Sequence, residues 1–313
     1  MVANDGNQRQ TVASVLGAVL TLLVTPTRRA ARRGRRDRLA VRVVTQNLWG
    51  RRGAWDERRE ALVEGMRRLE PDLVALPESI ETDAYDQVVD VLGSEYHVAH
   101  QAAREPGDDR DVEPGQGHSL ASRWPLGEVR ELDLHLTPRT AGFACGTLVA
   151  EVLAPEPFGT LLFGFHNPSW KLQLAHEREL QAVAAANFIE EFDGGRNLHV
   201  ILTADLDADP ESSSARFWTG RQALGGTSVC YRDAWESAHP GEPGHTFTPN
   251  NPIMVGRDWP FRRIDYIFVR CGEHEGPTLE ITACERIFDE PIGGVWASDH
   301  FGVCADLATP VNP

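Results

Sequence analysis

Several residue types are scarce in this chain, and each scarcity argues against a class of protein. The 313 residues include only five cysteines, which are widely spaced and form no C-x-x-C pair. This pattern argues against both a zinc ribbon and a disulfide framework. A core of this size needs no disulfides. We therefore interpret the cysteines as small buried side chains in a reducing compartment.

The short motifs of several enzyme classes are missing as well. The sequence contains no G-x-S-x-G, no phosphate-binding loop and no dinucleotide-binding fingerprint. Asp205-x-Asp207-x-Asp209 begins like a calcium loop. Such a loop needs glycine where Pro210 stands and glutamate where Arg216 stands, so the pattern excludes it.

Lysine is nearly absent, and charge is distributed unevenly. Lys171 is the only lysine among 31 basic residues, and the chain carries 46 acidic ones. Residues 1–39 hold eight arginines and two aspartates, which leaves 23 basic and 44 acidic side chains, a net charge of −21, on residues 40–313. Such a body is poorly suited to binding a nucleic-acid backbone by bulk electrostatics. We expect a small or locally recognised substrate, with a cation that offsets the acids at the site.

A long hydrophobic run is also missing. The apolar run from Val12 to Val24 is shorter than the roughly 20 residues of a spanning helix. Seven of the eight nearby arginines follow it, whereas the positive charge of a secretory signal comes before its apolar run. Three interpretations of residues 1–39 stay open: an inserted helix that keeps the body in the cytoplasm, a peripheral helix on anionic lipid, and an extension without structure. The sequence predicts a cytoplasmic protein, with membrane association through this segment as the alternative.

The body alternates between strand-like and helix-like segments. Short apolar runs typical of strands cover 39–46, 73–76, 119–123, 129–136, 144–153, 160–165, 198–202, 264–269, 279–287 and 301–307. Apolar stripes at helical spacing cover 55–69, 85–92 and 177–192, and a further helix begins near the serines at 212–214. We expect a surface loop over 102–116 and irregular structure over 231–261. With no internal repeat, the pattern predicts one α/β domain over 40–313, with two sheets sandwiched by helices.

Polar side chains recur where the predicted strands end. They are Asn47, Glu78, His166, Asp205 with Asp207, and Asp299 with His300. Strand ends at one rim of a sheet can bring together side chains that are far apart in sequence. Taken singly, each has an ordinary explanation as a turn, cap or surface residue. Asp265 differs, because a carboxylate inside the apolar run Ile264–Val269 would need a partner.

These residues and their neighbours form an ordered series of motifs. The series is Asn47 in TQNLWG, Glu78 in PDLVALPES, Ser122-Arg-Trp-Pro125, His166, Arg178 with Gln181, Asp205 with Asp207, Asp265 in RIDYIF, and Ser298-Asp-His300. It resembles the endonuclease/exonuclease/phosphatase superfamily, over nearly the whole body. The resemblance implies a four-layer α/β sandwich of two packed mixed sheets flanked by helices. It also implies hydrolysis of a phosphate ester with Mg²⁺, or with Mn²⁺ as the alternative.

The resemblance assigns metal-binding roles to three positions. Glu78 is similar to the principal carboxylate ligand, helped by the side-chain oxygen of Asn47. Asp299 resembles the second acidic contributor near the metal. Oxygen ligands suit a hard cation such as Mg²⁺. Whether one or two ions bind stays open.

The resemblance assigns catalytic roles to five further residues. His300 and His166 are similar to the two histidines that contact the scissile phosphate, and Asp265 to the carboxylate that orients His300. Asp205 resembles the residue that positions or deprotonates the attacking water. Asp207 stands where the family has asparagine, and an extra carboxylate would repel the phosphate unless it is protonated or bound to a cation. We therefore expect a shifted pKa at Asp207 or a second cation beside it.

The substrate is the least determined feature. We expect a monomeric hydrolase of a small or lipid-linked phosphate ester, with DNA or RNA cleavage as the enzymatic alternative. A non-catalytic binding module of the same fold is a third possibility, and the joint presence of the site residues argues against it. Arg123, Trp170 and Ser298 are candidate substrate-binding residues, although core packing is the ordinary explanation for an aromatic side chain.

Overall fold

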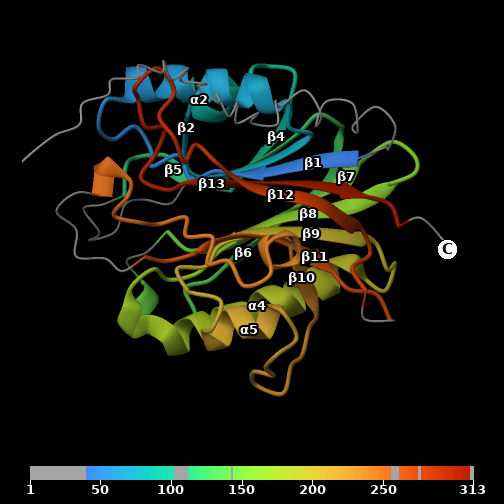
Figure 1. The fold of residues 1–313 in the computed structure, drawn as a ribbon. Coiled ribbons are helices and arrows are strands. Elements are labelled where there is room, and N and C mark those ends of the chain that lie inside the picture. The colour runs from blue at the N-terminus through green and yellow to red at the C-terminus, as the bar shows by residue number, and fades with distance from the viewer. Residues whose placement is uncertain (1–39, 102–111, 142–143, 255–260, 274–275, 311–313) are drawn as a thin grey trace, which may run out of the picture. The chain divides into compact units, whose positions relative to one another are not determined.

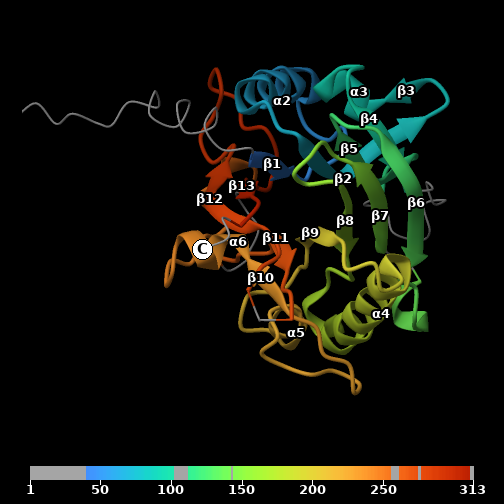
Figure 2. The same cartoon turned by 90° about the vertical axis from the view of Figure 1, so that its right-hand side faces the viewer.

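A computed structural model describes residues 40–101, 112–141, 144–254, 261–273 and 276–310. In this part of the chain, two β-sheets lie face to face, with helices on their outer sides (Figures 1 and 2). The four-layer α/β sandwich of mixed sheets predicted from the sequence is therefore confirmed. The predicted extension over residues 1–39 lies outside the described residues.

The first sheet has seven strands in the order β12-β13-β1-β2-β5-β4, with β3 paired to β2. Their bounds are β1 (Ala40–Thr45), β2 (Leu73–Thr82), β3 (Tyr85–Asp86), β4 (His97–His100), β5 (Gln116–Ser122), β12 (Glu280–Ile287) and β13 (Gly302–Ala308). Only β1 and β2 run parallel among the described pairs of this sheet. A parallel pair needs a crossover, and α2 (Trp55–Leu69) supplies it.

The second sheet has six strands in the order β10-β11-β9-β8-β7-β6. Their bounds are β6 (Leu126–Asp133), β7 (Gly146–Leu153), β8 (Thr160–Asn167), β9 (His199–Asp205), β10 (Tyr231–Asp233) and β11 (Asp265–Arg270). Here β8 and β9 are the parallel pair, and α4 (Ala175–Asp193) is their crossover. Each sheet thus contains one strand–helix–strand unit, and Asn47 and His166 lie at the ends of their first strands.

The remaining helices are short. They are α3 (Gln87–Leu92), α5 (Ser213–Trp218), α6 (Ala234–Ala238) and the 3-10 turns η1 (Pro138–Thr140), η2 (Leu172–Leu174) and η3 (Pro252–Met254). No helix of the described ranges is long and apolar enough to cross a membrane.

The core explains why most strands appear in the sequence as continuous apolar runs. Val43, Phe163 and Val303 pack between the two sheets, whereas Val44 faces α2 and Leu162 faces α4. Strands covered on both faces need apolar residues at every position, so the alternation of a one-sided sheet is lost.

Three local predictions differ from the structure. The short strand β4 was not predicted, and residues 231–261, predicted to be irregular, contain β10 and α6. The helix predicted over 85–92 begins only at Gln87, because the Asp86 carboxylate accepts the N–H groups of Val88 (2.9 Å) and Val89 (3.1 Å) and so caps it. Most of the loop predicted over 102–116 lies outside the described residues.

Candidate active site

The ends of four strands bring the central site residues together. Asn47 follows β1, Asp205 is the last residue of β9 and Asp265 is the first of β11. His300 lies two residues before Gly302, the first residue of β13. Asp265 and Asp205 are directly opposite each other in the antiparallel pair β11–β9. Residues that are opposite in such a pair point to the same face, so the two carboxylates necessarily lie side by side.

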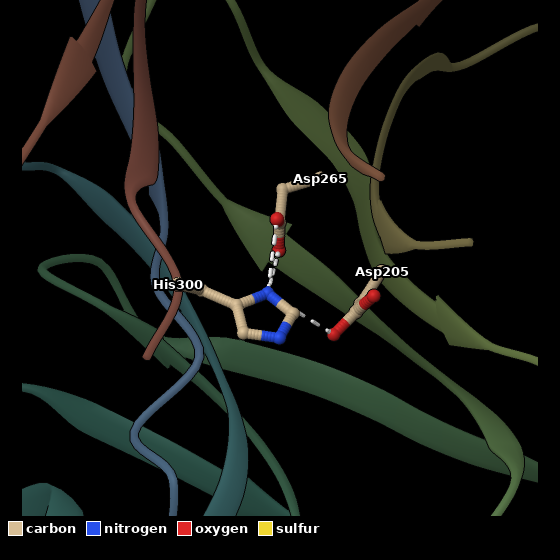
Figure 3. Close-up of side chains that lie close together, drawn as sticks. All are labelled: Asp205, Asp265 and His300. Atoms are coloured by element: carbon tan, nitrogen blue, oxygen red, sulfur yellow. Dashed lines mark hydrogen bonds and ion pairs between the residues drawn. The ribbon is translucent and has the colours of Figure 1, made fainter. Parts of the chain in front are cut away.

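The His300 ring faces both of these carboxylates (Figure 3). Its Nδ1 is 3.1 Å from Oδ2 and 3.3 Å from Oδ1 of Asp265, and 3.8 Å from Oδ2 of Asp205. All three side chains are buried. With Nδ1 engaged by Asp265, Nε2 is the ring atom left to act on a substrate.

The two carboxylates determine the charge of His300. Burial lowers the pKa of His300, but the charges of Asp265 and Asp205 outweigh burial and hold that pKa well above its usual value. Burial, followed by the charge of Asp265, raises the pKa of Asp205. One imidazolium can balance only one of the two carboxylates, so excess negative charge remains for a proton or a cation.

Glu78 lies beside this cluster, but at a β-bulge and not at a strand end. The register of β2 against β5 shifts between Pro77 and Ser79, and Glu78 has a left-handed backbone with φ of 55°. The sequence prediction of a strand end at Glu78 is therefore wrong, because β2 continues to Thr82. A bulge re-aims the side chain of the extra residue, which here is the carboxylate.

Both oxygens of Glu78 are held by donors. Asn47 Nδ2 donates to Oε1 at 3.1 Å, while Arg52 Nη1 and Gln116 Nε2 each lie 3.3 Å from Oε2. Burial, followed by the charge of Asp299, raises the pKa of Glu78, and Asn47 and Arg52 oppose that rise.

Asn47 connects Glu78 to the histidine cluster. Its Nδ2 also donates to Asp205 Oδ2 at 3.1 Å, and its Oδ1 accepts the backbone N–H of Trp49 at 2.8 Å. The oxygen that the resemblance assigns to the metal therefore faces a backbone amide in this rotamer, and its ligand role stays a prediction.

Asp299 and Ser298 are buried in the loop before β13. Ser298 Oγ donates to Asp299 Oδ1 at 3.3 Å, and Asn251 Nδ2 donates to the Ser298 carbonyl at 2.8 Å. The charge of Asp299 acts on Glu78, which places the predicted metal-binding carboxylates near each other. The contacts of Ser298 are thus within the loop that carries Asp299 and with Asn251. Its contact with substrate stays a prediction.

His166 is the second histidine of the predicted site, and its surroundings differ from those of His300. It is fully buried, Thr147 Oγ1 lies 2.8 Å from Nδ1, and Nε2 has no hydrogen-bond partner among the described residues. Burial, with a smaller contribution from His118, lowers the pKa of His166 to about 3. The ring is therefore neutral at physiological pH.

Asp207 has the shifted pKa that its sequence context predicted, and it also has a cationic neighbour, Arg262, that was not predicted. Burial raises the pKa of Asp207 to about 6, against the opposing charge of Arg262. Arg262 is 3% exposed, donates to the Asp207 carbonyl, and has Nη1 3.9 Å from Asp207 Oδ1. The doubled arginine in RRIDYIF was the available signal for this guanidinium.

Two predicted substrate-binding residues are not brought to this cluster. Arg123 donates to the Pro71 carbonyl at 2.8 Å, next to the β2–β5 pair formed by Leu73 and Ser122, which is far along β2 from Glu78. Trp170 packs with the small apolar cluster around Leu134, Cys145 and Leu174. Their substrate-binding roles stay predictions that this placement does not support.

The donor set fits a divalent cation. Ligand atoms of Asp205, Asp265 and His300 lie within 4.8 Å of one another. The predicted metal-binding role of Glu78 and Asp299, whose oxygens suit a hard ion, stays a prediction. Asp205 Oδ2 is the oxygen nearer His300, while Asp205 Oδ1 is buried without a hydrogen-bond partner among the described residues.

The chain matches one family model and several solved structures. The model of the Endonuclease/Exonuclease/phosphatase family matches residues 44–300. No curated protein matches the sequence. Similar folds include D. rerio TDP2 complexed with a single-strand DNA product (19% identity, 87% of this chain and 100% of that chain, TM-score 0.66). A second similar structure is the human Nocturnin catalytic domain with bound sulfate (16% identity, 87% of this chain and 96% of that chain, TM-score 0.66). A third is an endonuclease/exonuclease/phosphatase from Beutenbergia cavernae (22% identity, 86% of this chain and 72% of that chain, TM-score 0.63).

Proposed function

Because the chain belongs to the endonuclease/exonuclease/phosphatase family, we propose that it is a Mg²⁺-dependent hydrolase of small or lipid-linked phosphate esters, with Mn²⁺ as an alternative cation. The observation that carries this proposal is the buried cluster of Asp205, Asp265 and His300 beside Glu78. A cation bound at Glu78 and Asp299 would supply positive charge for the phosphate oxygens.

The side chains have complementary proton roles in this reaction. His300, kept protonated by its carboxylate partners, donates from Nε2 to a phosphate oxygen, and Asp265 fixes the ring. His166, whose Nδ1 faces Thr147, presents Nε2 to a second oxygen. Asp205, with its raised pKa, holds the attacking water and accepts its proton. Phosphoryl transfer depends mainly on such positioning and charge balance.

Cleavage of nucleic acid is the second candidate. A structure of similar fold is the D. rerio TDP2 complex with a single-strand DNA product, which favours a phosphodiester of DNA. The net charge of −21 on residues 40–313 opposes it, because a polyanion gains little from such a surface. A binding module without catalysis would not need the matched pair of a charged and a neutral histidine.

The test is a substrate panel with metal controls. We would incubate the full chain with 4-nitrophenyl phosphate, bis(4-nitrophenyl) phosphate, sphingomyelin and supercoiled plasmid, with Mg²⁺, Mn²⁺ or EDTA. We expect metal-dependent turnover that Glu78→Gln and His300→Asn each lower by about 100-fold or more. Asp265→Asn should lower kcat and leave the melting temperature near that of the wild type.

The control is Glu60→Gln, a change on the exposed face of α2 that should leave the rate unaltered. Equal turnover by wild type and Glu78→Gln on every substrate would contradict the proposal. Nicking of plasmid that depends on His300, without turnover of the small esters, would make the nuclease the leading function.

A further inference from the structure

Arg52 holds the outer oxygen of the proposed metal-binding carboxylate. It lies in the turn after β1, five residues beyond Asn47, and its Nη1 is 3.3 Å from Glu78 Oε2. Its Nη2 donates to Gln116 Oε1 at 3.1 Å, and Glu113 Oε2 lies 3.9 Å from Nη1. The guanidinium therefore has two acidic neighbours, one inside the site and one at its rim.

The backbone of Arg52 is fixed, while its side chain reaches solvent. The Arg52 carbonyl accepts a hydrogen bond from Arg58 Nε at 3.0 Å, and the glycines at 50 and 53 have φ of 50° and 64°, which favours glycine at both positions. The Arg52 side chain is 23% exposed, and that of Glu78 is 30% exposed. Because the backbone is fixed and the side chain is partly exposed, the Arg52 guanidinium can change partners without movement of the turn.

We propose that Arg52 is a movable counter-ion that holds Glu78 before a divalent cation binds, and afterwards pairs with the substrate phosphate. This inference rests on the proposed function, because it needs Glu78 to bind the cation. Arg52 is then a substrate-binding residue that also sets the affinity for the metal.

Electrostatics requires the change of partner. A guanidinium at hydrogen-bond distance from a ligand oxygen repels a dication on the same carboxylate. Glu113, 3.9 Å away, offers a second partner, and a phosphate brought to the cation offers a better one. Arginine binds phosphate oxygens through two parallel N–H donors, which a glutamine or a lysine cannot reproduce.

The first measurement is metal binding without substrate. Mn²⁺ would be titrated into the full chain and its free ion followed by electron paramagnetic resonance. We expect Arg52→Gln to bind Mn²⁺ about three- to tenfold more tightly than the wild type, because one nearby like charge is removed. Arg52→Lys keeps the charge and should stay near the wild-type affinity.

The second measurement is the KM for bis(4-nitrophenyl) phosphate at saturating Mn²⁺. We expect Arg52→Gln to raise KM by about tenfold, because a charge-assisted contact with the phosphate is lost. Arg52→Lys should raise it by less. Tighter metal binding together with weaker substrate binding is a pattern that a merely structural arginine would not give.

Arg51 provides the matched control. It is the adjacent, exposed arginine of the same turn, and its guanidinium lies over the Tyr85 ring at 4.9 Å. Arg51→Gln removes the same charge and should change neither quantity by more than about twofold, because exposed charges are screened. Equal effects of the two substitutions would overturn the inference in favour of bulk charge.

Two further results separate this inference from the proposed function. In the first, Glu78→Gln loses Mn²⁺ binding, but Arg52→Gln matches the wild type in its Mn²⁺ affinity or in its KM. This result would overturn the role of Arg52 and leave the metal site standing. Undiminished Mn²⁺ binding in Glu78→Gln would overturn the metal site, and the inference with it.

Discussion

Two buried histidines among the predicted site residues have opposite protonation behaviour. His300 has two carboxylates around Nδ1, and their charges raise its pKa well above the usual value despite burial. His166 has only the hydroxyl of Thr147 at Nδ1, so burial acts unopposed and lowers its pKa to about 3. At neutral pH the His300 ring is therefore charged and the His166 ring is neutral.

The environment of His166 predicts a pH dependence of stability. Between its ordinary pKa near 6.5 and its folded value near 3, the unfolded chain binds a proton at this position and the folded chain does not. The free energy of unfolding contributed by this group is therefore complete above pH 6.5 and is lost as the pH falls towards 3. At pH 5 the loss is about 2 kcal/mol relative to neutral pH.

His166→Gln should remove this part of the acid sensitivity. Urea unfolding of wild type and variant at pH 7 and pH 5 measures it, and the two should differ by about 2 kcal/mol in their loss of stability. His176, an exposed histidine at the start of α4, supplies the control substitution His176→Gln. Identical losses in wild type and His166→Gln would contradict the neutral state assigned to His166.

At the scale of elements, helix α2 holds two site loops in place through one arginine. Arg58 is 2% exposed and donates to the carbonyls of Leu48, Gly50, Arg52 and Ala297 at 2.8–3.1 Å. The first three carbonyls belong to the turn after Asn47, and the last belongs to the loop that carries Asp299. One guanidinium thus joins the segments on either side of the proposed metal site.

We expect Arg58→Met to destabilise the protein by about 3 kcal/mol, because four carbonyls lose their donor in a buried position. Chemical unfolding measures this loss, and Mn²⁺ affinity should fall with it, because the loops carrying Asn47 and Asp299 separate. Arg59, the neighbouring arginine, is 39% exposed and pairs with Asp90 at 2.7 Å. Arg59→Met should cost less than about 1 kcal/mol, and an equal cost for both substitutions would argue against the loop-joining role.

The sequence predicts helices and strands better than it predicts the local backbone conformations that orient the site side chains. The apolar stripe of α2 and the continuous apolar run of β1 can be predicted from periodicity. A helix that buries one face, or a strand that buries both faces, needs apolar residues at regular positions of the sequence. The bulge at Glu78 has no such pattern, since Leu73–Leu76 looks like a complete strand and the pairing partner β5 lies about 40 residues further on.

The site residues were predicted as a set, but their contacts were not. Asp265 and His300 appear in recognisable motifs, yet their pairing depends on β11 lying opposite β9 and on the loop before β13, which only the fold determines. Arg52 and Arg262 stood next to the quoted motifs and were missed, because an arginine in a chain rich in arginine carries little information until its partner is known.

At the scale of the whole molecule, the distribution of charge sets a limit on the substrate. Residues 40–313 carry 44 acidic and 23 basic side chains, and the densest basic segment of the chain lies at 28–38. A nuclease that relies on phosphate contacts loses affinity steeply as salt rises, because counterion release drives its binding. An acidic body repels a polyanion, and added salt relieves that repulsion.

The full chain should therefore respond to salt in the opposite sense to a basic nuclease. Between about 20 and 150 mM NaCl, where the Debye length falls from about 20 to 8 Å, KM for any cleavage of long single-stranded DNA should stay level or fall. KM for bis(4-nitrophenyl) phosphate should change by less than about twofold, because a small monoanion experiences mainly the local site. A steep rise of the KM for DNA with increasing salt would contradict the argument from the acidic body. It would point to the arginines at 28–38 as the DNA contact, because they form the one basic cluster in the sequence dense enough to release several counterions.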